Sequence, residues 1–226
     1  MRVMEPGYEI MHLPEGEFIL SHLELAGRTC YKSEDKITED SAKALLKALI
    51  RSGHDSVLEH ISITVRFICD RGISHELVRH RVASFSQEST RYANYAKDRF
   101  GSQIAVIRPF FWQEDSDAYR QWQGAMEMAE RAYLALLDMG AKPQEARSVL
   151  PNSLKTDIVT TANIRQWRHI FNLRCAAASH PQIRQLMLPL LDTFHERIPV
   201  LFDDLHEKFV ESIEAFGTAA PVKLYG

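Results

Sequence analysis

One stretch decides the fold class: Ile61-Ser62-Ile63-Thr64-Val65-Arg66-Phe67-Ile68-Cys69-Asp70. Apolar side chains alternate with mostly polar ones along it, and this period of two is typical of a β-strand with one buried face. Residues 103–109 and 155–162 also indicate strands, and the first fourteen residues indicate a short strand and a turn. The chain therefore contains a sheet.

Apolar residues at helical spacing predict helices over much of the remaining chain. The expected ranges are 17–31, about 38–52, 74–81, 115–139, 143–151, 163–178 and 181–216. Ser74 and Asn163 are suited to cap helix N-termini, and Gly53 and Gly140 to end helices. Strands and helices do not alternate regularly, which argues against a doubly wound sheet. We predict a single α+β domain over 1–226, mostly helical, with a small mixed or antiparallel sheet.

Composition excludes several classes of protein. The chain has 226 residues, 45% of them hydrophobic and 25% charged, with a formal net charge of −3, which does not favour a general nucleic-acid binder. No apolar run reaches the roughly 18 residues of a membrane helix, and no secretory signal begins the sequence. The three cysteines are far apart, which argues against a disulfide framework or a cysteine metal site. We expect a cytoplasmic protein without a membrane partner.

The segment 79–92 has the densest chemistry, Arg-His-Arg-Val-Ala-Ser-Phe-Ser-Gln-Glu-Ser-Thr-Arg-Tyr. One interpretation is a solvated polar surface. The other is an anion site, because arginine and serine side chains offer phosphate oxygens both charge and directed hydrogen bonds. At helical spacing Arg81 shares a side with Leu77 and Val78, so we expect part of this cluster to face inward.

A second segment, 163–174, combines an apolar helical stripe with a polar one. Arg174 falls near the centre of the apolar stripe, where an unpaired charge costs several kcal/mol. Three outcomes are open: the helix ends earlier, Arg174 meets a carboxylate, or Arg174 meets a ligand. Arg147, on a short amphipathic helix, reads by itself as a surface residue.

A third segment, 53–60, reads Gly-His-Asp-Ser-Val-Leu-Glu-His between a helix and the alternating strand. Its histidines and carboxylates match no standard metal-ligand spacing, so we predict a polar loop and no metal site. The chain also has no G-x-G-x-x-G sequence, so a nucleotide cofactor would need another mode of binding.

These segments resemble the flavin-dependent thymidylate synthase family (ThyX). The family signature is Arg-His-Arg, seven residues and then Ser, and here it stands as Arg79-His80-Arg81 followed by Ser89. The loop 53–60 and the segments 145–151 and 163–174 resemble other family elements in the same order. The resemblance spans roughly residues 10 to 200 and implies an α+β homotetramer with active sites shared between subunits.

The resemblance also implies a reaction and its residues. It implies methylation of dUMP to dTMP, with methylenetetrahydrofolate as carbon donor, NADPH-reduced FAD as hydride source and tetrahydrofolate as product. The expected FAD contacts are Ser56, Arg79, His80, Arg81, Gln87, Asn163, Arg165 and His169, with His54 near the flavin ring and folate. The expected dUMP contacts are Glu76, Leu77, Val78, Arg79, Gln87, Glu88, Ser89, Thr90, Arg91, Arg147 and Arg174, with Arg174 as the catalytic residue that activates uracil.

Two positions depart from the family pattern. Glu76 stands where some members carry Gln, and an acid there would repel phosphate unless it pairs with an arginine such as Arg79. His169 stands where other members carry Asn, and both side chains can donate a hydrogen bond. Two alternatives stay open: a non-catalytic nucleotide- or RNA-binding module, and a flavoprotein that no longer makes thymidylate.

Overall fold

The computed structural model describes residues 1–96 and 101–217. Its strands are β1 (Arg2–Met4), β2 (Gly7–His12), β3 (Ser62–Asp70), β4 (Ser84–Gln87), β5 (Ala105–Ile107) and β6 (Lys155–Asn163). Its α-helices are α1 (Gly16–Tyr31), α2 (Ser41–Arg51), α3 (Arg71–Leu77), α4 (Asp117–Asp138), α5 (Pro143–Ala146), α6 (Ile164–Arg174), α7 (Pro181–Arg197) and α8 (Pro199–Gly217). Short 3₁₀ turns include η1 (Glu34–Lys36), η2 (Asp55–His60) and η4 (Arg147–Val149).

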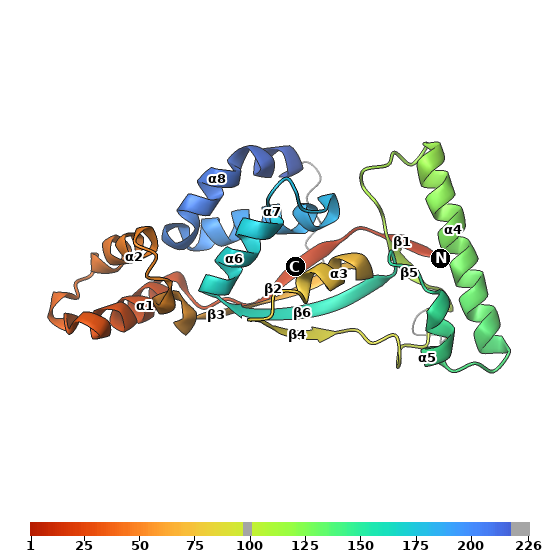
Figure 1. The fold of residues 1–226 in the computed structure, drawn as a ribbon, viewed down its shortest axis with the longest axis horizontal. Coiled ribbons are helices and arrows are strands. Elements are labelled where there is room, and N and C mark those ends of the chain that lie inside the picture. The colour runs from red at the N-terminus through yellow and green to blue at the C-terminus, as the bar shows by residue number, and fades with distance from the viewer. Residues whose placement is uncertain (97–100, 218–226) are drawn as a thin grey trace.

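The main sheet has four antiparallel strands in the order β2-β3-β6-β4, and β1 and β5 form a separate parallel pair. Helices α3, α6, α7 and α8 lie on one side of the main sheet, α1 and α2 lie beyond one of its ends, and α4 and α5 lie beyond the other (Figure 1). The predicted α+β class with a small mixed or antiparallel sheet is therefore confirmed. Among the described residues, no helix is both long and apolar enough to cross a membrane.

The alternating strand is the centre of the sheet, as its pattern predicts. In β3 the side chains of Ile63, Val65 and Phe67 are fully buried beneath the helices, whereas Thr64 and Arg66 point to the opposite, partly exposed face. The indole of Trp167 on α6 donates a hydrogen bond to the Ile63 carbonyl at 3.1 Å. This bond satisfies a polar group that would otherwise be buried without a partner, and it fixes α6 on the sheet.

Around this contact lies the larger of two hydrophobic clusters, which joins the sheet to α1, α2, α6, α7 and α8. The second cluster lies around α4 and β5 and includes Tyr95, Val106, Trp122 and Tyr133. The predicted single domain over 1–226 stays a prediction.

Several local predictions are confirmed by cap contacts. Asn163 accepts a hydrogen bond from the backbone of Gln166 at 2.8 Å and begins α6, and Gly53 follows α2 with a positive φ of 70°. Two helix predictions are wrong in their bounds. The helix expected at 74–81 is α3, which begins three positions earlier, at Arg71, because Asp70, at the end of β3, accepts from the Ile73 backbone at 2.7 Å.

The helical region predicted over 181–216 is confirmed. It consists of two helices, because Pro199 cannot continue the hydrogen-bond ladder and α7 ends at Arg197. The helix expected to reach Ala178 ends at Arg174. The chain also forms β4 within the arginine-rich segment, where polar composition hides a strand that pairs with β6.

Candidate active site

The guanidinium of Arg174 is held by three protein acceptors at the C-terminal end of α6. Its Nη1 donates to Glu76 Oε2 at 2.8 Å, its Nη2 to the Glu76 carbonyl at 3.0 Å, and its Nε to His80 Nε2 at 2.9 Å. Of the three alternatives left open, the structure shows the second: Arg174 is still part of α6, and its side chain meets a carboxylate. A guanidinium has five N–H donors, so two remain beyond these three contacts within the described residues.

His80 is the acceptor in this arrangement because it is neutral. The side chain is only 4% exposed, and burial, followed by the nearby Arg174 charge, lowers its pKa from 6.5 to about 4. The ring of His169 lies edge-on, with centroids 5.8 Å apart. Glu76 therefore supplies the negative charge that balances Arg174, and it pairs with this residue rather than with Arg79.

Two adjoining hollows flank α6. The first has a volume of about 640 Å³, and its lining includes Asn163, Arg165 and His169. The second, of about 410 Å³, is lined in part by His54 and Ser56. Asp55 and Arg165 line both, so five of the predicted cofactor contacts gather along one continuous depression. Arg165 is itself paired with Glu59 at 2.5 Å, and its side chain is 54% exposed.

The remaining predicted cofactor contacts lie elsewhere. Arg79 and Arg81 are exposed, which corrects the expectation that Arg81 faces inward. The expectation assumed that Arg81 continues the same helix as Leu77. Because α3 ends at Leu77, Arg81 lies outside the helix and does not share its buried face. In residues 1–96 and 101–217, neither guanidinium makes a hydrogen bond or ion pair with the protein, so both keep their donors for another molecule.

Four predicted substrate contacts form a second basic cluster near α5. The Arg91 backbone N–H donates to Ser89 Oγ at 3.3 Å, and Arg147 Nη1 donates to the hydroxyl of buried Thr90 at 3.4 Å. Arg91 also donates from Nε to Gln144 at 3.2 Å. Ser89, Arg91 and Arg147 are exposed, so this cluster presents two cations and a hydroxyl outward.

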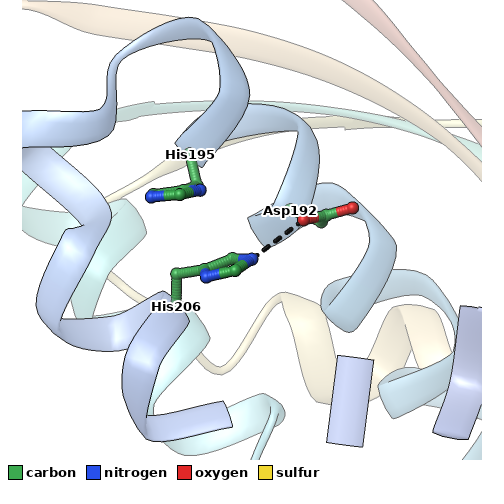
Figure 2. Close-up of side chains that lie close together, drawn as sticks. All are labelled: Asp192, His195 and His206. Atoms are coloured by element: carbon green, nitrogen blue, oxygen red, sulfur yellow. Dashed lines mark hydrogen bonds and ion pairs between the residues drawn. The ribbon is translucent and has the colours of Figure 1, made fainter. Parts of the chain in front are cut away.

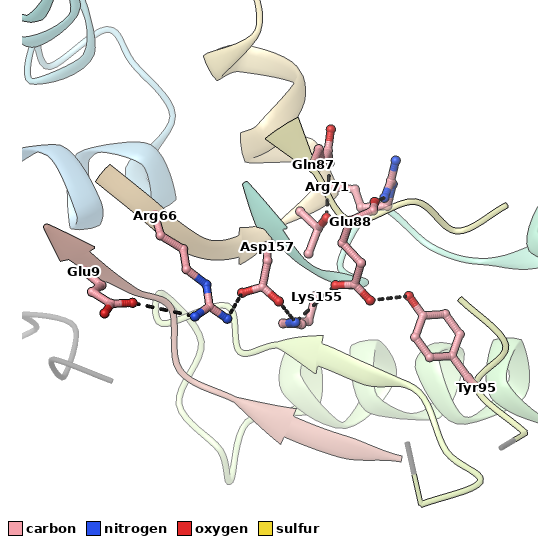
Figure 3. Close-up of polar contacts among 9 residues, drawn as sticks. Glu9, Arg66, Arg71, Gln87, Glu88, Tyr95, Lys155 and Asp157 are labelled. Atoms are coloured by element: carbon pink, nitrogen blue, oxygen red, sulfur yellow. Dashed lines mark hydrogen bonds and ion pairs between the residues drawn. The ribbon is translucent and has the colours of Figure 1, made fainter. Parts of the chain in front are cut away.

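Glu88 belongs to a charged ladder across the partly exposed face of the sheet (Figure 3). Lys155 donates to Glu88 at 3.1 Å and also to Asp157, which accepts from Arg66 at 3.1 Å. Tyr95 donates to Glu88 at 3.3 Å. The ladder aligns side chains from β3, β6 and the end of β4, and it positions the carboxylate of Glu88.

Gln87 donates from its amide nitrogen to two hydroxyls, Ser74 at 2.8 Å and Thr156 at 3.2 Å. Both amide N–H donors are therefore used within the protein. Sequence reasoning missed these partners and the Lys155–Asp157 part of the ladder. No sequence motif identifies these partners. Ser74 and Thr156 reach Gln87 only through tertiary packing, and Lys155 and Asp157, two positions apart on β6, meet Glu88 and Arg66 only when the strands pair. Leu77 is fully buried, whereas Val78 is 39% exposed and available to a ligand.

The predicted site residues thus divide into two groups within one chain. Arg174, Glu76 and His80 adjoin the flanking hollows through the ring contact with His169. Among the described residues, no hydrogen bond joins the cluster of Ser89, Arg91 and Arg147 to Arg174. Exposed arginines of this kind, on an α+β fold without a Rossmann phosphate loop, are suited to a ligand that carries phosphate groups.

Comparison with known proteins identifies the family. Residues 19–200 match the family model Thy1, described as thymidylate synthase complementing protein. The chain is 35% identical over 202 residues to the flavin-dependent thymidylate synthase of Geobacter sulfurreducens, covering 86% of this chain and 84% of that one. It is 37% identical over 202 residues to the flavin-dependent thymidylate synthase of Corynebacterium aurimucosum, covering 81% and 79%.

A solved structure agrees. The UMP/dUMP methylase PolB from Streptomyces cacaoi, bound with 5-Br dUMP, superimposes with a TM-score of 0.72 at 26% identity, covering 92% of this chain and 98% of that one. The chain belongs to the flavin-dependent thymidylate synthase family, a family of methyltransferases, as its sequence motifs predict.

Proposed function

We propose that the protein methylates dUMP to dTMP, with methylenetetrahydrofolate as carbon donor and NADPH as the source of reducing power. The observation that carries the proposal is the Arg174 guanidinium, fixed by Glu76 and His80 and left with two donors. A rigid cation of this kind stabilises negative charge that develops on a uracil ring as its C5 becomes nucleophilic. Bound FAD would supply the hydride that completes the methyl group.

The two hollows suit a flavin in part. Asn163, Arg165 and His169 offer hydrogen-bond donors to the polar edge of a flavin ring, and His54 and Ser56 extend this set into the adjoining hollow. Asp55, Glu59 and Asp204 also line the first hollow or both, so a diphosphate needs additional positive charge. The unpaired Arg79 and Arg81 are suited to supply it, and His80 would contact the flavin from its buried position.

The substrate would span the two groups of residues. Ser89, Thr90, Arg91 and Arg147 are suited to the phosphate because they combine a hydroxyl, backbone N–H groups and two guanidiniums. The uracil and deoxyribose would lie against the group at Arg174. The further substrate contacts that we propose are Glu76, Leu77, Val78, Arg79, Gln87 and Glu88.

We further propose a homotetramer in which one subunit supplies the phosphate cluster and another supplies Arg174. The support is that no hydrogen bond joins these two groups within the described part of a single chain. Sharing sites between subunits would also let Arg79 serve FAD in one site and dUMP in another. We also propose a cytoplasmic location.

An anaerobic absorbance experiment tests the proposed function. The purified protein is loaded with FAD, reduced with NADPH, and then mixed with dUMP, with methylenetetrahydrofolate, or with both. Reoxidation of the flavin and formation of dTMP only when both are present would support the coupled reaction. Absence of a flavin spectrum after FAD loading, or reoxidation without dTMP, would contradict it.

A further inference from the structure

A group of metal-ligating side chains lies between α7 and α8, apart from the residues discussed so far (Figure 2). Asp192 and His195 are three positions apart on α7 and therefore share one face of the helix. His206 reaches toward them from α8. One ligand atom from each residue lies within 4.8 Å of the others.

Hydrogen bonds determine which lone pairs the two imidazoles offer. His195 Nε2 lies 3.1 Å from Asp203 Oδ1, and Asp203 is anchored in turn by Lys47 at 3.0 Å. A neutral His195 that donates from Nε2 to this carboxylate has its lone pair on Nδ1. Carboxylate support of this kind commonly fixes the tautomer of a histidine that binds a metal through its other nitrogen.

Two of the three proposed ligands, His206 and Asp192, are already in contact. His206 Nε2 lies 2.9 Å from Asp192 Oδ1. In a tetrahedral zinc site with bonds of 2.0–2.1 Å, two ligand atoms lie roughly 3.4 Å apart. To bind zinc, His206 Nε2 and Asp192 Oδ1 must move slightly apart from 2.9 Å. The two ligand atoms that are farthest apart, at most 4.8 Å, must move closer together. Forming the site therefore requires side-chain rotations, which must also turn the stacked imidazole rings so that their lone pairs converge on the ion.

The group is also accessible. The side chains of His195, His206 and Asp192 are 27%, 21% and 42% exposed, so an ion can enter and water can complete its coordination. Two imidazoles and one carboxylate favour a borderline transition metal over Mg²⁺ or Ca²⁺, which prefer oxygen ligands. We propose that Asp192, His195 and His206 form a binding site for one Zn²⁺-like divalent ion, with Asp203 holding His195 in place.

The site would act as a clamp between two helices. It joins α7 to α8 on either side of the break at Pro199. Asp204 and Leu205, which follow Asp203 directly, line the 640 Å³ hollow beside α6. Arg168 on α6 donates to Asp204 at 2.6 and 2.8 Å. A bound ion would therefore stabilise one wall of this hollow without touching the residues around Arg174.

A simpler interpretation is that the group is two independent His–Asp pairs. The imidazole rings of His195 and His206 stack with centroids 3.9 Å apart and an interplanar angle of 14°, which two neutral rings can do without an ion. The two interpretations differ in their response to zinc. The paired arrangement has no reason to bind zinc more tightly than the exposed histidines elsewhere on the chain.

Zinc titration of the full-length, tag-free protein distinguishes them. After treatment with a chelator, the wild type and the variants D192N, H195N and H206N are titrated with ZnCl₂ by calorimetry, and melting curves are recorded with and without zinc. H22N serves as the matched control, because His22 is an exposed helical histidine on α1, outside the group. Melting without zinc establishes that each variant is folded.

We expect the wild type and H22N to bind one equivalent of Zn²⁺. Each of the variants D192N, H195N and H206N should bind this equivalent at least about tenfold more weakly. Zinc should raise the melting temperature of the wild type and H22N only. The proposal is overturned if D192N and H206N bind zinc within twofold of the wild type, or if the wild type shows no such equivalent. If one variant does not fold, the other two still decide the outcome.

Discussion

Replacing Arg174 with lysine tests whether a fixed guanidinium, rather than positive charge alone, is required. Arg174 donates three hydrogen bonds to acceptors on two residues, at 2.8, 2.9 and 3.0 Å. A lysine ammonium is a point charge on a flexible stem and cannot reproduce this fork. We expect R174K to keep the local charge and to lose two of the three contacts.

The size of the effect follows from those two contacts. Each charge-assisted hydrogen bond contributes about 1.5–3 kcal/mol, and we use the lower limit because the Arg174 side chain is 19% exposed. Two lost contacts then amount to about 3 kcal/mol, which corresponds to a rate of dTMP formation lower by roughly a hundredfold if the contacts orient Arg174 for the transition state. FAD binding should not change, because Arg174 does not line the flanking hollows.

The assay measures dTMP formation in a single turnover from reduced enzyme, together with the flavin spectrum and the dUMP dissociation constant. E76Q is the control, because its amide oxygen can still accept from Arg174 while the carboxylate charge is removed. We expect E76Q to keep at least about a tenth of the wild-type rate, since a neutral acceptor still orients the guanidinium. A rate for R174K within threefold of wild type would refute the reasoning, and loss of flavin from R174K would refute the separation of the two roles.

Three further predictions concern stability, protonation and substrate affinity. W167F should lower the free energy of unfolding by about 2–4 kcal/mol in urea denaturation, because it creates a cavity and removes the 3.1 Å hydrogen bond to the Ile63 carbonyl; no change would contradict this. The folded pKa of His80, about 4, lies below the unfolded value of 6.5, so its contribution to stability is complete above pH 6.5 and is lost as the pH falls toward 4. NMR should show no imidazole titration of His80 between pH 8 and 5, and a midpoint near 6.5 would refute its neutrality. R147A should raise the KM for dUMP by about tenfold or more with an unchanged flavin spectrum, since it removes one charge-assisted contact; an unchanged KM would exclude a phosphate role.

Much of the architecture was predictable from short stretches of sequence. Period-two alternation identified β3, and the apolar stripe of α6 is buried as predicted. In both patterns the apolar residues mark the face of the strand or helix that is buried. The pattern is visible in the sequence whichever elements pack against that face. The cap at Asn163 was also readable because its acceptor and donor are three residues apart.

Predictions failed where two local signals competed or where pairing was distant. The sequence analysis assigned the cap to Ser74, whereas in the structure Asp70, at the end of β3, caps α3 by accepting from the Ile73 backbone. The strand β4 has a polar sequence because only one of its edges pairs within the described chain, with β6. The sequence analysis predicted no metal site, whereas the site proposed here takes its ligands from two helices and has no contiguous motif.

By itself, the sequence determined the α+β class, the central strand, the amphipathic helix that begins after Asn163 and membership of the flavin-dependent thymidylate synthase family. Only the tertiary structure decided that Arg174 pairs with Glu76 and neutral His80, and that Arg79 and Arg81 have no protein partner among residues 1–96 and 101–217. The physical reason is the range of the interactions. Periodicity and caps act within a few residues, whereas Arg174 and Glu76 are 98 positions apart and meet only when α3 and α6 pack on the same sheet.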